Sequence, residues 1–277
     1  MAAVAGKKGP VVKVAALVLA GSRGEADLVA RAEGVTHKAL VDVAGQPMLA
    51  RVIAALHAAG IARVAVAADD GHVIALAQSL GAEIVASAET PGASVARAFA
   101  ILGGPLLVTT ADHGLLRPEW VWDFLGDAPP DCDVAVLLAQ RDTVETALSG
   151  SRRTYLSFAD GDWSGCNMFL LANSRAAAAI DTWQMVERNR KRPWRIAARL
   201  GIPTLLTYLA GRMTLGHAVR RLGDRVGIEA HAVAARDGLA AVDIDWPEDL
   251  VDARRIASAR CDGARLMPIR SARYHYS

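Results

Sequence analysis

The stretch Pro105-Leu-Leu-Val-Thr-Thr-Ala-Asp112 is mostly apolar and ends in an aspartate. A short, nearly continuous apolar run is typical of a strand that is buried on both faces, as in a parallel sheet. In open α/β sheets, ligands bind beyond the carboxyl ends of the strands. The stretch therefore predicts an α/β protein and places Asp112 at the edge of the sheet where a ligand binds.

The segments around this stretch alternate between strand and helix patterns. Residues 11–19 form another apolar run, which ends in the glycine turn Ala20-Gly-Ser-Arg-Gly24. After Pro47, apolar residues recur at helical spacing as far as Gly60, a typical C-cap residue. Further strands are expected at 64–68, 83–86, 105–112, 134–139 and 168–171, further helices at 71–80 and 94–102, and a strand-to-helix unit at 241–250. This alternation predicts a doubly wound, mostly parallel α/β sheet with right-handed crossovers.

The composition is that of a globular protein. The 277 residues are 52% hydrophobic and carry 31 Lys+Arg against 29 Asp+Glu, a formal net charge of +2. A non-specific nucleic-acid binder usually has a larger basic excess, so no nucleic-acid partner is expected. We expect one domain over residues 1–258, with a basic, mostly helical elaboration at about 181–223, followed by a basic, poorly ordered tail over 259–277.

The cysteines and the apolar runs bear on the compartment. Three cysteines without a CxxC pair cannot form a disulfide framework, which favours a reducing compartment. No apolar run approaches the length of a membrane span. The apolar start imitates a signal peptide, but Lys13 interrupts it and a glycine turn follows, which favours a buried strand. The expected location is the cytoplasm.

The glycine turn could direct backbone N–H groups at a phosphate. It is not a P-loop, because no Gly-Lys-Ser/Thr follows, and it lacks the third glycine of GxGxxG. Asp42 lies near the distance expected of a ribose-binding acid, so spacing alone leaves a dehydrogenase open. By itself, the turn is equally consistent with ligand binding and with a turn that only connects the strand to the next element.

Lys38 is isolated in an arginine-rich chain. The sequence has five lysines against 26 arginines, and Lys38 is the only lysine between Lys13 and Lys191. Arginine fills the ordinary surface positions, whereas a compact ammonium suits the neutralisation of phosphate. Lys38 is therefore a candidate phosphate ligand, with a chance solvated lysine as the alternative.

Several motifs together resemble the NTP transferases of the molybdenum-cofactor guanylyltransferase-like family. Leu19-Ala-Gly-Ser-Arg-Gly24, Lys38-Ala-Leu40 and Gly45-Gln-Pro-Met-Leu49 are similar to the family's LAGGxGxRxG, KxL and GxPLI motifs. Thr110-Ala-Asp-His113 is similar to its metal-binding aspartate after the fourth strand, and Asp243-Ile-Asp-Trp-Pro-Glu-Asp-Leu250 to its DxDTPEDL. The motifs cover most of the chain. The departures are Ser22 at the second glycine, residues 25–34 before Lys38, Trp246 in place of threonine, and the basic helical block.

The resemblance implies a Mg²⁺-dependent enzyme with a Rossmann-like nucleotidyltransferase fold of the GT-A type and a helical insertion. It implies that the nucleotide is bound by Leu19, Ala20, Gly21, Ser22, Arg23, Gly24, Lys38, Gly92 and Ser94. It assigns the metal to Asp112 and Asp245, the acceptor to Asn167, and catalysis to Arg23, Lys38 and Asp112. The chemistry agrees, because attack of an ionised phosphate on an α-phosphorus needs positioning and charge neutralisation rather than a general base.

Each role has a structural alternative. Asp112 could cap the turn that follows it, and Asp245 could be a helix N-cap before Pro247. Ser94 could be the N-cap of its own helix, and Asn167 an ordinary turn residue. Asp243 and Asp245 alternate, so they should share one face of a strand.

The substrates are only partly indicated. Ser94-Val-Ala-Arg-Ala98 resembles the SVxxA turn of cytidylyltransferases, which favours CTP marginally over GTP. The expected acceptor is a phosphorylated small molecule such as a sugar phosphate or a lipid head group. The basic block around Trp183 and Trp194 suits an anionic acceptor or weak peripheral contact with an anionic membrane. The alternatives are a glycosyltransferase on the same fold and a non-catalytic nucleotide-binding module, neither of which would release pyrophosphate.

Overall fold

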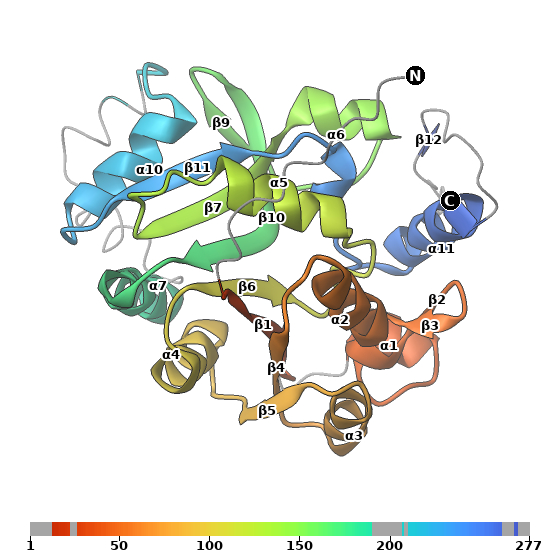
Figure 1. Ribbon diagram of the computed structural model, residues 1–277. Helices are drawn as coiled ribbons and strands as arrows, with labels where there is room; N and C mark the ends of the chain where they lie inside the picture. Colours follow the sequence, from red (N-terminus) through yellow and green to blue (C-terminus); the bar gives the residue numbers. More distant parts are fainter. Residues whose placement is uncertain (1–12, 23–26, 190–206, 208–209, 262–268, 271–277) are drawn as a thin grey trace, which may run out of the picture.

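Strand β1 (Ala15–Ala20) lies at the centre of an eight-stranded sheet in the computed structural model, which describes residues 13–22, 27–189, 207, 210–261 and 269–270 (Figure 1). It pairs in parallel with β4 (Arg63–Ala68) and with β6 (Leu106–Thr110). The strand order is β11-β7-β10-β6-β1-β4-β5, and only the pairings of β10 (Gly161–Leu171) are antiparallel among those described in this sheet. The predicted doubly wound, mostly parallel sheet is confirmed.

The other elements complete the sheet and its layers. The remaining strands of the sheet are β5 (Glu83–Ala86), β7 (Val134–Gln140), β9 (Leu156–Phe158) and β11 (Ala230–Ala234). Small pairs are formed by β2 (Asp42–Val43) with β3 (Gln46–Pro47) and by β8 (Leu148–Ser149) with β12 (Ile269–Arg270). The helices are α1 (Leu28–Ala32), α2 (Met48–Ala58), α3 (Gly71–Ser79), α4 (Pro91–Leu102), α5 (Pro118–Asp127), α6 (Arg141–Ala147), α7 (Ala177–Asn189), α10 (Leu215–Asp224) and α11 (Pro247–Cys261), with 3-10 helices η1 (Lys38–Leu40), η2 (Ser174–Ala176) and η3 (Gly238–Ala241).

Both faces of the sheet are covered by helices. Neighbouring side chains of a strand point to opposite faces, and β1 therefore contributes to two cores. Val18 packs in the core that includes α2, whereas Leu17 packs with Val95 of α4 and Ile180 of α7 (Figure 1). Burial on both faces explains why the central strands are apolar at successive positions instead of alternating.

The strand order reverses at β1, because the chain runs from β1 to β4 and β5 and then returns to β6 on the other side of β1. A parallel sheet opens a crevice at such a switch point, beyond the carboxyl ends of its strands. There the backbone N–H of Ala111 donates to the carbonyl of Leu19 over 2.9 Å. The fold thus brings the glycine turn and Asp112 to the same edge.

Two expected elements differ from the structure. No strand forms over 241–245; the segment makes a backbone hydrogen bond from Ile244 to the carbonyl of Asp112 (3.2 Å), and the strand in this part of the chain is β11. The apolar alternation there reflects burial of Val242 and Ile244 in the core. Helix α4 begins before Ser94, because the hydroxyl of Thr90 caps it by accepting from Ala93 N.

The expected boundaries are tested only in part. The basic block at 181–223 contains the end of α7 and most of α10, and residues 190–206 and 208–209 lie outside the described chain. The expected domain end at residue 258 falls inside α11. In the expected tail, Ile269–Arg270 pair in parallel with β8, while residues 262–268 and 271–277 are outside the described chain. None of the described helices has the length and apolar character needed to cross a membrane.

Candidate active site

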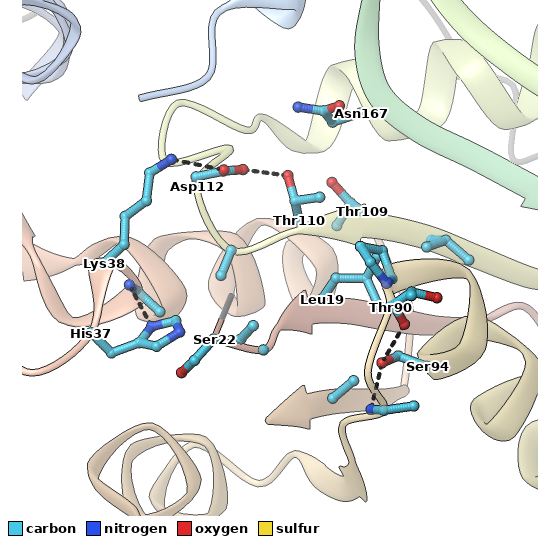
Figure 2. A pocket seen from close by; sticks show the side chains of 18 of the residues that line it. Leu19, Ser22, His37, Lys38, Thr90, Ser94, Thr109, Thr110, Asp112 and Asn167 are labelled. Carbon is cyan, nitrogen blue, oxygen red and sulfur yellow. Dashed lines mark hydrogen bonds and ion pairs between the residues drawn. The ribbon is translucent and has the colours of Figure 1, made fainter. Parts of the chain in front are cut away.

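A cavity of about 710 Å³ lies at the switch point, between the ends of β1 and β6, helix η1 and the N-terminus of α4 (Figure 2). Nine of the predicted site residues line it: Leu19, Ala20, Gly21, Ser22, Lys38, Ser94, Asp112, Asn167 and Asp245. Gly92 lies in the first turn of α4 but is not among the described lining residues. Arg23 and Gly24 are outside the described residues, so their predicted roles stay predictions.

The glycine turn is closely packed. A Cβ added at Gly21 would lie 3.1 Å from the Cβ of Ser87, so a larger residue there would push the turn away from β5. The backbone N–H and the hydroxyl of Ser22 both donate to Asp69 Oδ1, over 3.0 and 3.1 Å. The turn is therefore tied to the end of β4 through an exposed carboxylate.

The N-terminus of α4 forms another wall of the cavity. Thr90 caps the helix, and the hydroxyl of Ser94, in its second turn, accepts from Ala88 N (2.8 Å) and donates to the carbonyl of Thr90 (3.2 Å). Ser94 is thus not the N-cap of α4. Its hydroxyl holds the turn that precedes the helix, and that turn faces the cavity (Figure 2).

Lys38 lies between two carboxylates. Its Nζ is 3.0 Å from Asp112 Oδ2 and 2.7 Å from Asp245 Oδ1, and its side chain is 13% exposed. Burial alone would lower the pKa of Lys38, but attraction by Asp112 and Asp245 raises it overall. Helix η1 presents the lysine, and the ring Nδ1 of His37 caps that helix by accepting from Ala39 N. The two carboxylates use two of the three N–H donors of the ammonium, which leaves one donor for a further acceptor.

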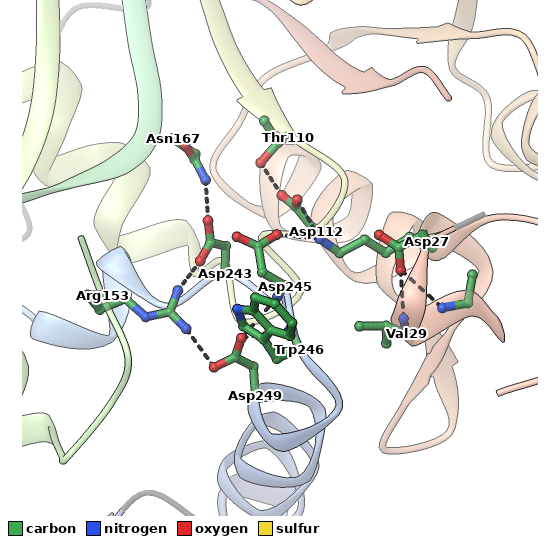
Figure 3. A network of polar contacts seen from close by, with 12 residues as sticks. Asp27, Val29, Thr110, Asp112, Arg153, Asn167, Asp243, Asp245, Trp246 and Asp249 are labelled. Carbon is green, nitrogen blue, oxygen red and sulfur yellow. Dashed lines mark hydrogen bonds and ion pairs between the residues drawn. The ribbon is translucent and has the colours of Figure 1, made fainter. Parts of the chain in front are cut away.

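Asp112 follows β6, and its carboxylate faces the cavity rather than the turn behind it. It accepts from Lys38 Nζ and from the hydroxyl of Thr110 (Figures 2 and 3). Burial opposes ionisation, yet the ammonium of Lys38 and the Thr110 hydroxyl hold the pKa of Asp112 below its usual value. Asp112 is therefore ionised at neutral pH.

Asp243 and Asp245 have different partners, although their spacing predicts one shared face. Asp245 bonds to Lys38, whereas Asp243 accepts from Arg153 and from Asn167 Nδ2 (Figure 3). The side chain of Asp245 does not cap α11. Instead, Asp249 Oδ2 accepts from the backbone N–H groups of Asp245 and Trp246, each over 3.0 Å.

Arg153 is a buried cation that the sequence did not single out. Its side chain is 5% exposed, and it donates to Asp243 and, over 2.7 Å, to Asp249. Burial raises the pKa of Asp243 to about 6, and Arg153 opposes that rise. The chain has 26 arginines, and Arg153 lies in an irregular segment, so nothing in the local sequence marks it as functional. Asp249 is different, because an acid three residues after Trp246 fits an N-terminal capping pattern.

The oxygen donors suit a divalent cation. Mg²⁺ prefers oxygen ligands and is commonly held by one or two carboxylates together with substrate phosphates. Asp112 and Asp245 share one ammonium, so they lie close enough to share a cation as well. Within the described chain, no group of three His, Cys, Asp or Glu side chains could hold a metal. The residues fit Mg²⁺, and their metal roles stay predictions.

An aromatic pair lines the cavity beyond Asn167. Phe169 of β10 and Trp183 of α7 have ring centroids 5.1 Å apart, and both line the cavity. Phe169 was expected only as part of a strand, and Trp183 only as part of the basic block that could meet an anionic acceptor or membrane. The part of the basic block around Trp194, on which the expected membrane contact depends, lies outside the described residues.

Comparisons with known proteins identify the family of this chain. Residues 16–195 match the MobA-like NTP transferase domain. The chain is 31% identical over 272 residues to the bifunctional protein GlmU of Rhizorhabdus wittichii, covering 91% of this chain and 56% of that protein. It is 35% identical over 119 residues to a 3-deoxy-manno-octulosonate cytidylyltransferase of Rhodopseudomonas palustris, covering 40% and 49%. The chain thus spans about half the length of the curated relatives it matches.

Solved structures show the same fold. A hypothetical transferase from Thermus thermophilus superposes with a TM-score of 0.75 and 29% identity, over 86% of this chain and all of that one. A CMP:2-keto-3-deoxy-manno-octonic acid synthetase in complex with CTP superposes with a TM-score of 0.56 and 18% identity, over 90% of this chain and all of that one. The second likeness bears on the fold alone. Because the family match covers most of the described chain, the chain belongs to the MobA-like NTP transferase family.

Proposed function

We propose that this chain is a nucleotidyltransferase, which moves a nucleotidyl group from an NTP to a phosphorylated small molecule and releases pyrophosphate. The observation that carries the proposal is the triad of Lys38, Asp112 and Asp245 at the carboxyl edge of the sheet's switch point. In this proposal, the triad would supply one cation and two carboxylates where a triphosphate meets its acceptor. Nucleotidyltransferase relatives support the reaction class.

In the proposed step, an oxygen of the acceptor's phosphate forms a bond to the α-phosphorus of the NTP. The bond from that phosphorus to the oxygen bridging to the β-phosphorus breaks, and pyrophosphate leaves with the electron pair. The acceptor phosphate is already ionised, so no protein base is needed. The chain's own contribution is to position both substrates and to neutralise their charge.

The charged groups divide this work. Asp112 and Asp245 would hold Mg²⁺, which supplies charge neutralisation where the α-phosphate and the acceptor meet. Lys38 would transfer its ammonium from the carboxylates to the β- and γ-phosphates. Arg23, Gly24 and the backbone N–H groups of the glycine turn would bind the same phosphates.

The nucleotide we propose is CTP. The name of one relative, a cytidylyltransferase, supports CTP marginally over GTP. Ser94 and Gly92 would act on the base and ribose mainly by shaping the turn at Ala88–Thr90, because the hydroxyl of Ser94 already holds that turn.

The acceptor we propose is a sugar phosphate or a phosphorylated head group. Asn167 would bind it, and the rings of Phe169 and Trp183, tilted by 41° to each other, offer apolar surface against which the C–H face of a sugar ring could pack. The cytoplasm, where NTPs and reduced thiols occur, is the compartment we propose; Cys132 and Cys166 are free and buried.

The test is pyrophosphate release. The full chain is incubated with each NTP, Mg²⁺ and a pool of phosphorylated metabolites, and products are identified by mass spectrometry. Release of pyrophosphate with formation of an NDP-linked metabolite supports the proposal. Consumption of a nucleotide sugar without pyrophosphate release would instead show a glycosyltransferase. A product formed only from a non-phosphorylated sugar acid would retain the reaction but overturn the acceptor class.

A further inference from the structure

The strongest unexplained feature of the site is the buried guanidinium of Arg153. It lies between β8 and β9, and its partners are 90 and 96 residues away in the sequence. Its Nε donates to the Ser151 hydroxyl over 3.1 Å, while its two terminal nitrogens donate to Asp243 and Asp249. A guanidinium can bond in this way to several acceptors in one plane, which an ammonium on a flexible stem cannot do.

Each of the two carboxylates holds one part of the proposed site. Asp249 uses its second oxygen to accept from the backbone N–H groups of Asp245 and Trp246. Asp249 therefore determines where the Asp245 backbone lies, and Asp245 in turn meets Lys38. Arg153 is thus linked through Asp249 to Asp245, the proposed metal ligand, and the part of the cavity around Asp245 and Asp112 is called the metal side (Figure 3).

Asp243 holds the other part. Its Oδ2 accepts from Asn167 Nδ2 over 2.9 Å. Asn167 has a φ of 49°, which a non-glycine residue rarely adopts, and it lies where the pairing of β10 with β7 shifts register between Gly165 and Phe169. The Asp243 contact fixes the orientation of the Asn167 amide, and the part of the cavity around Asn167, where the acceptor is proposed to bind, is called the acceptor side.

We propose that Arg153 is a positioning residue, which sets the distance between the metal side and the acceptor side of the site by holding Asp245 through Asp249 and Asn167 through Asp243. Arg153 contacts neither substrate in this arrangement. The roles it serves at Asp245 and Asn167 rest on the proposed function, but the geometry that it fixes does not.

The test uses Arg153→Lys, with Arg152→Lys as the matched control because Arg152 is the exposed neighbour on the same segment. The first readout is Mn²⁺ affinity in the presence of CTP, measured by electron paramagnetic resonance. The second is the labelling rate of the Cys166 thiol in a background that lacks Cys132 and Cys261. Cys166 is 1% exposed and directly precedes Asn167, so it reports on the bulge. Circular dichroism checks the fold.

For Arg153→Lys we expect Mn²⁺ to bind about 10- to 100-fold more weakly, as loss of a residue that orients a metal ligand typically does, and Cys166 to be labelled faster. CTP affinity without metal should change less than Mn²⁺ affinity, since Ser22 and Ser94 are held by Asp69, Ala88 and Thr90 rather than by Arg153. Equal Mn²⁺ affinity and equal labelling in the Arg153 and Arg152 variants would overturn the inference.

Two further variants separate the branches and replace Arg153→Lys if it does not fold. Asp249→Asn should weaken Mn²⁺ binding and leave Cys166 labelling unchanged. Asp243→Asn should speed Cys166 labelling and leave Mn²⁺ binding unchanged. In each variant the new amide NH₂ group faces an N–H donor where a carboxylate oxygen had accepted a hydrogen bond. An identical effect of both variants on both readouts would contradict the two routes. Neither readout needs turnover. A chain that transfers no nucleotide would therefore refute the proposed function, while Mn²⁺ affinity and Cys166 labelling would still decide whether Arg153 positions the two carboxylates.

Discussion

The two sides of the cavity are held together by contacts of different range in the sequence. On the nucleotide side, the turn before α4 is fixed by Thr90 and Ser94, whose partners are three to six residues away. On the carboxylate side, Lys38 meets Asp112 and Asp245 across 74 and 207 residues. The turn before α4 is thus held by local hydrogen bonds, whereas the carboxylate side is held by ion pairs between distant segments.

The difference predicts how each side responds to substitution. A local hydrogen bond contributes about 1 kcal/mol, so its loss should change nucleotide affinity moderately. Removing Lys38 or Asp112, the two less exposed members of the ionic cluster, leaves a partly buried charge uncompensated, and the loss is larger. Changes on the carboxylate side should therefore alter metal binding and turnover strongly, whereas changes on the nucleotide side should leave the metal requirement intact.

The largest effect is expected at Asp112. Asp112→Asn removes the charge that faces Lys38 while keeping the shape of the side chain, and turnover should fall by at least about 10²-fold, as loss of a preorganised charge-stabilising group does. Pyrophosphate release measures it, with Asp123→Asn as a control on an exposed aspartate that pairs with Arg236. Wild-type rates in a folded Asp112→Asn protein would remove Asp112 from the mechanism.

A substitution of Lys38 should change the affinities for Mn²⁺ and for CTP in opposite directions. Its ammonium occupies the space between Asp112 and Asp245, where it competes with a divalent cation. In Lys38→Met, Mn²⁺ should bind about 10-fold more tightly to the nucleotide-free protein, the effect of removing one charge within contact distance. CTP should bind more weakly in the same variant, because a phosphate ligand is lost. Calorimetry measures both, and weaker Mn²⁺ binding without nucleotide would place the metal elsewhere.

On the nucleotide side, Ser94→Ala removes the acceptor of Ala88 N and leaves a part-buried donor without its partner. We expect a loss of about 1–3 kcal/mol in the free energy of unfolding. CTP affinity should fall roughly 3- to 10-fold, the worth of one hydrogen bond, with the Mg²⁺ requirement unchanged. Urea denaturation and calorimetry measure these quantities, and Ser79→Ala on the exposed side of α3 is the control. A changed Mg²⁺ requirement would show that the two sides are not independent.

The same difference in range explains what could be predicted from the sequence. Strands β1, β4, β5 and β6 were predicted within a few residues, because burial on both faces leaves a continuous apolar run. The strand expected at 241–245 was wrong, because its apolar alternation reports burial, while a strand also needs a free edge to pair with. That edge is decided by tertiary structure, and β11 occupies it beside β7.

The site divides in the same way. Lys38 was singled out by its isolation among arginines and Asp112 by its place after an apolar strand, and the resemblance of motifs added the metal roles of Asp112 and Asp245. The structure brings the three together. That Lys38 lies between the two carboxylates could not be predicted, since only the fold sets these distances. Arg153 was missed for the same reason, because its partners are in segments with no local relation to it.

The smallest effect is expected at Asp69, which supplies a long-range contact on the nucleotide side. Its exposed carboxylate holds the N–H and hydroxyl of Ser22, and it adds a negative charge beside the turn that would bind phosphates. Asp69→Ala should therefore tighten CTP binding by about 2- to 5-fold, the range of an exposed charge interaction. The gain should shrink as salt shortens the Debye length toward ~8 Å. Calorimetry at low and physiological ionic strength measures it, with Asp123→Ala as the control.

If Asp69→Ala instead weakened CTP binding at every salt concentration, the carboxylate would be holding the turn in its binding conformation, and this side would also depend on contacts between distant segments.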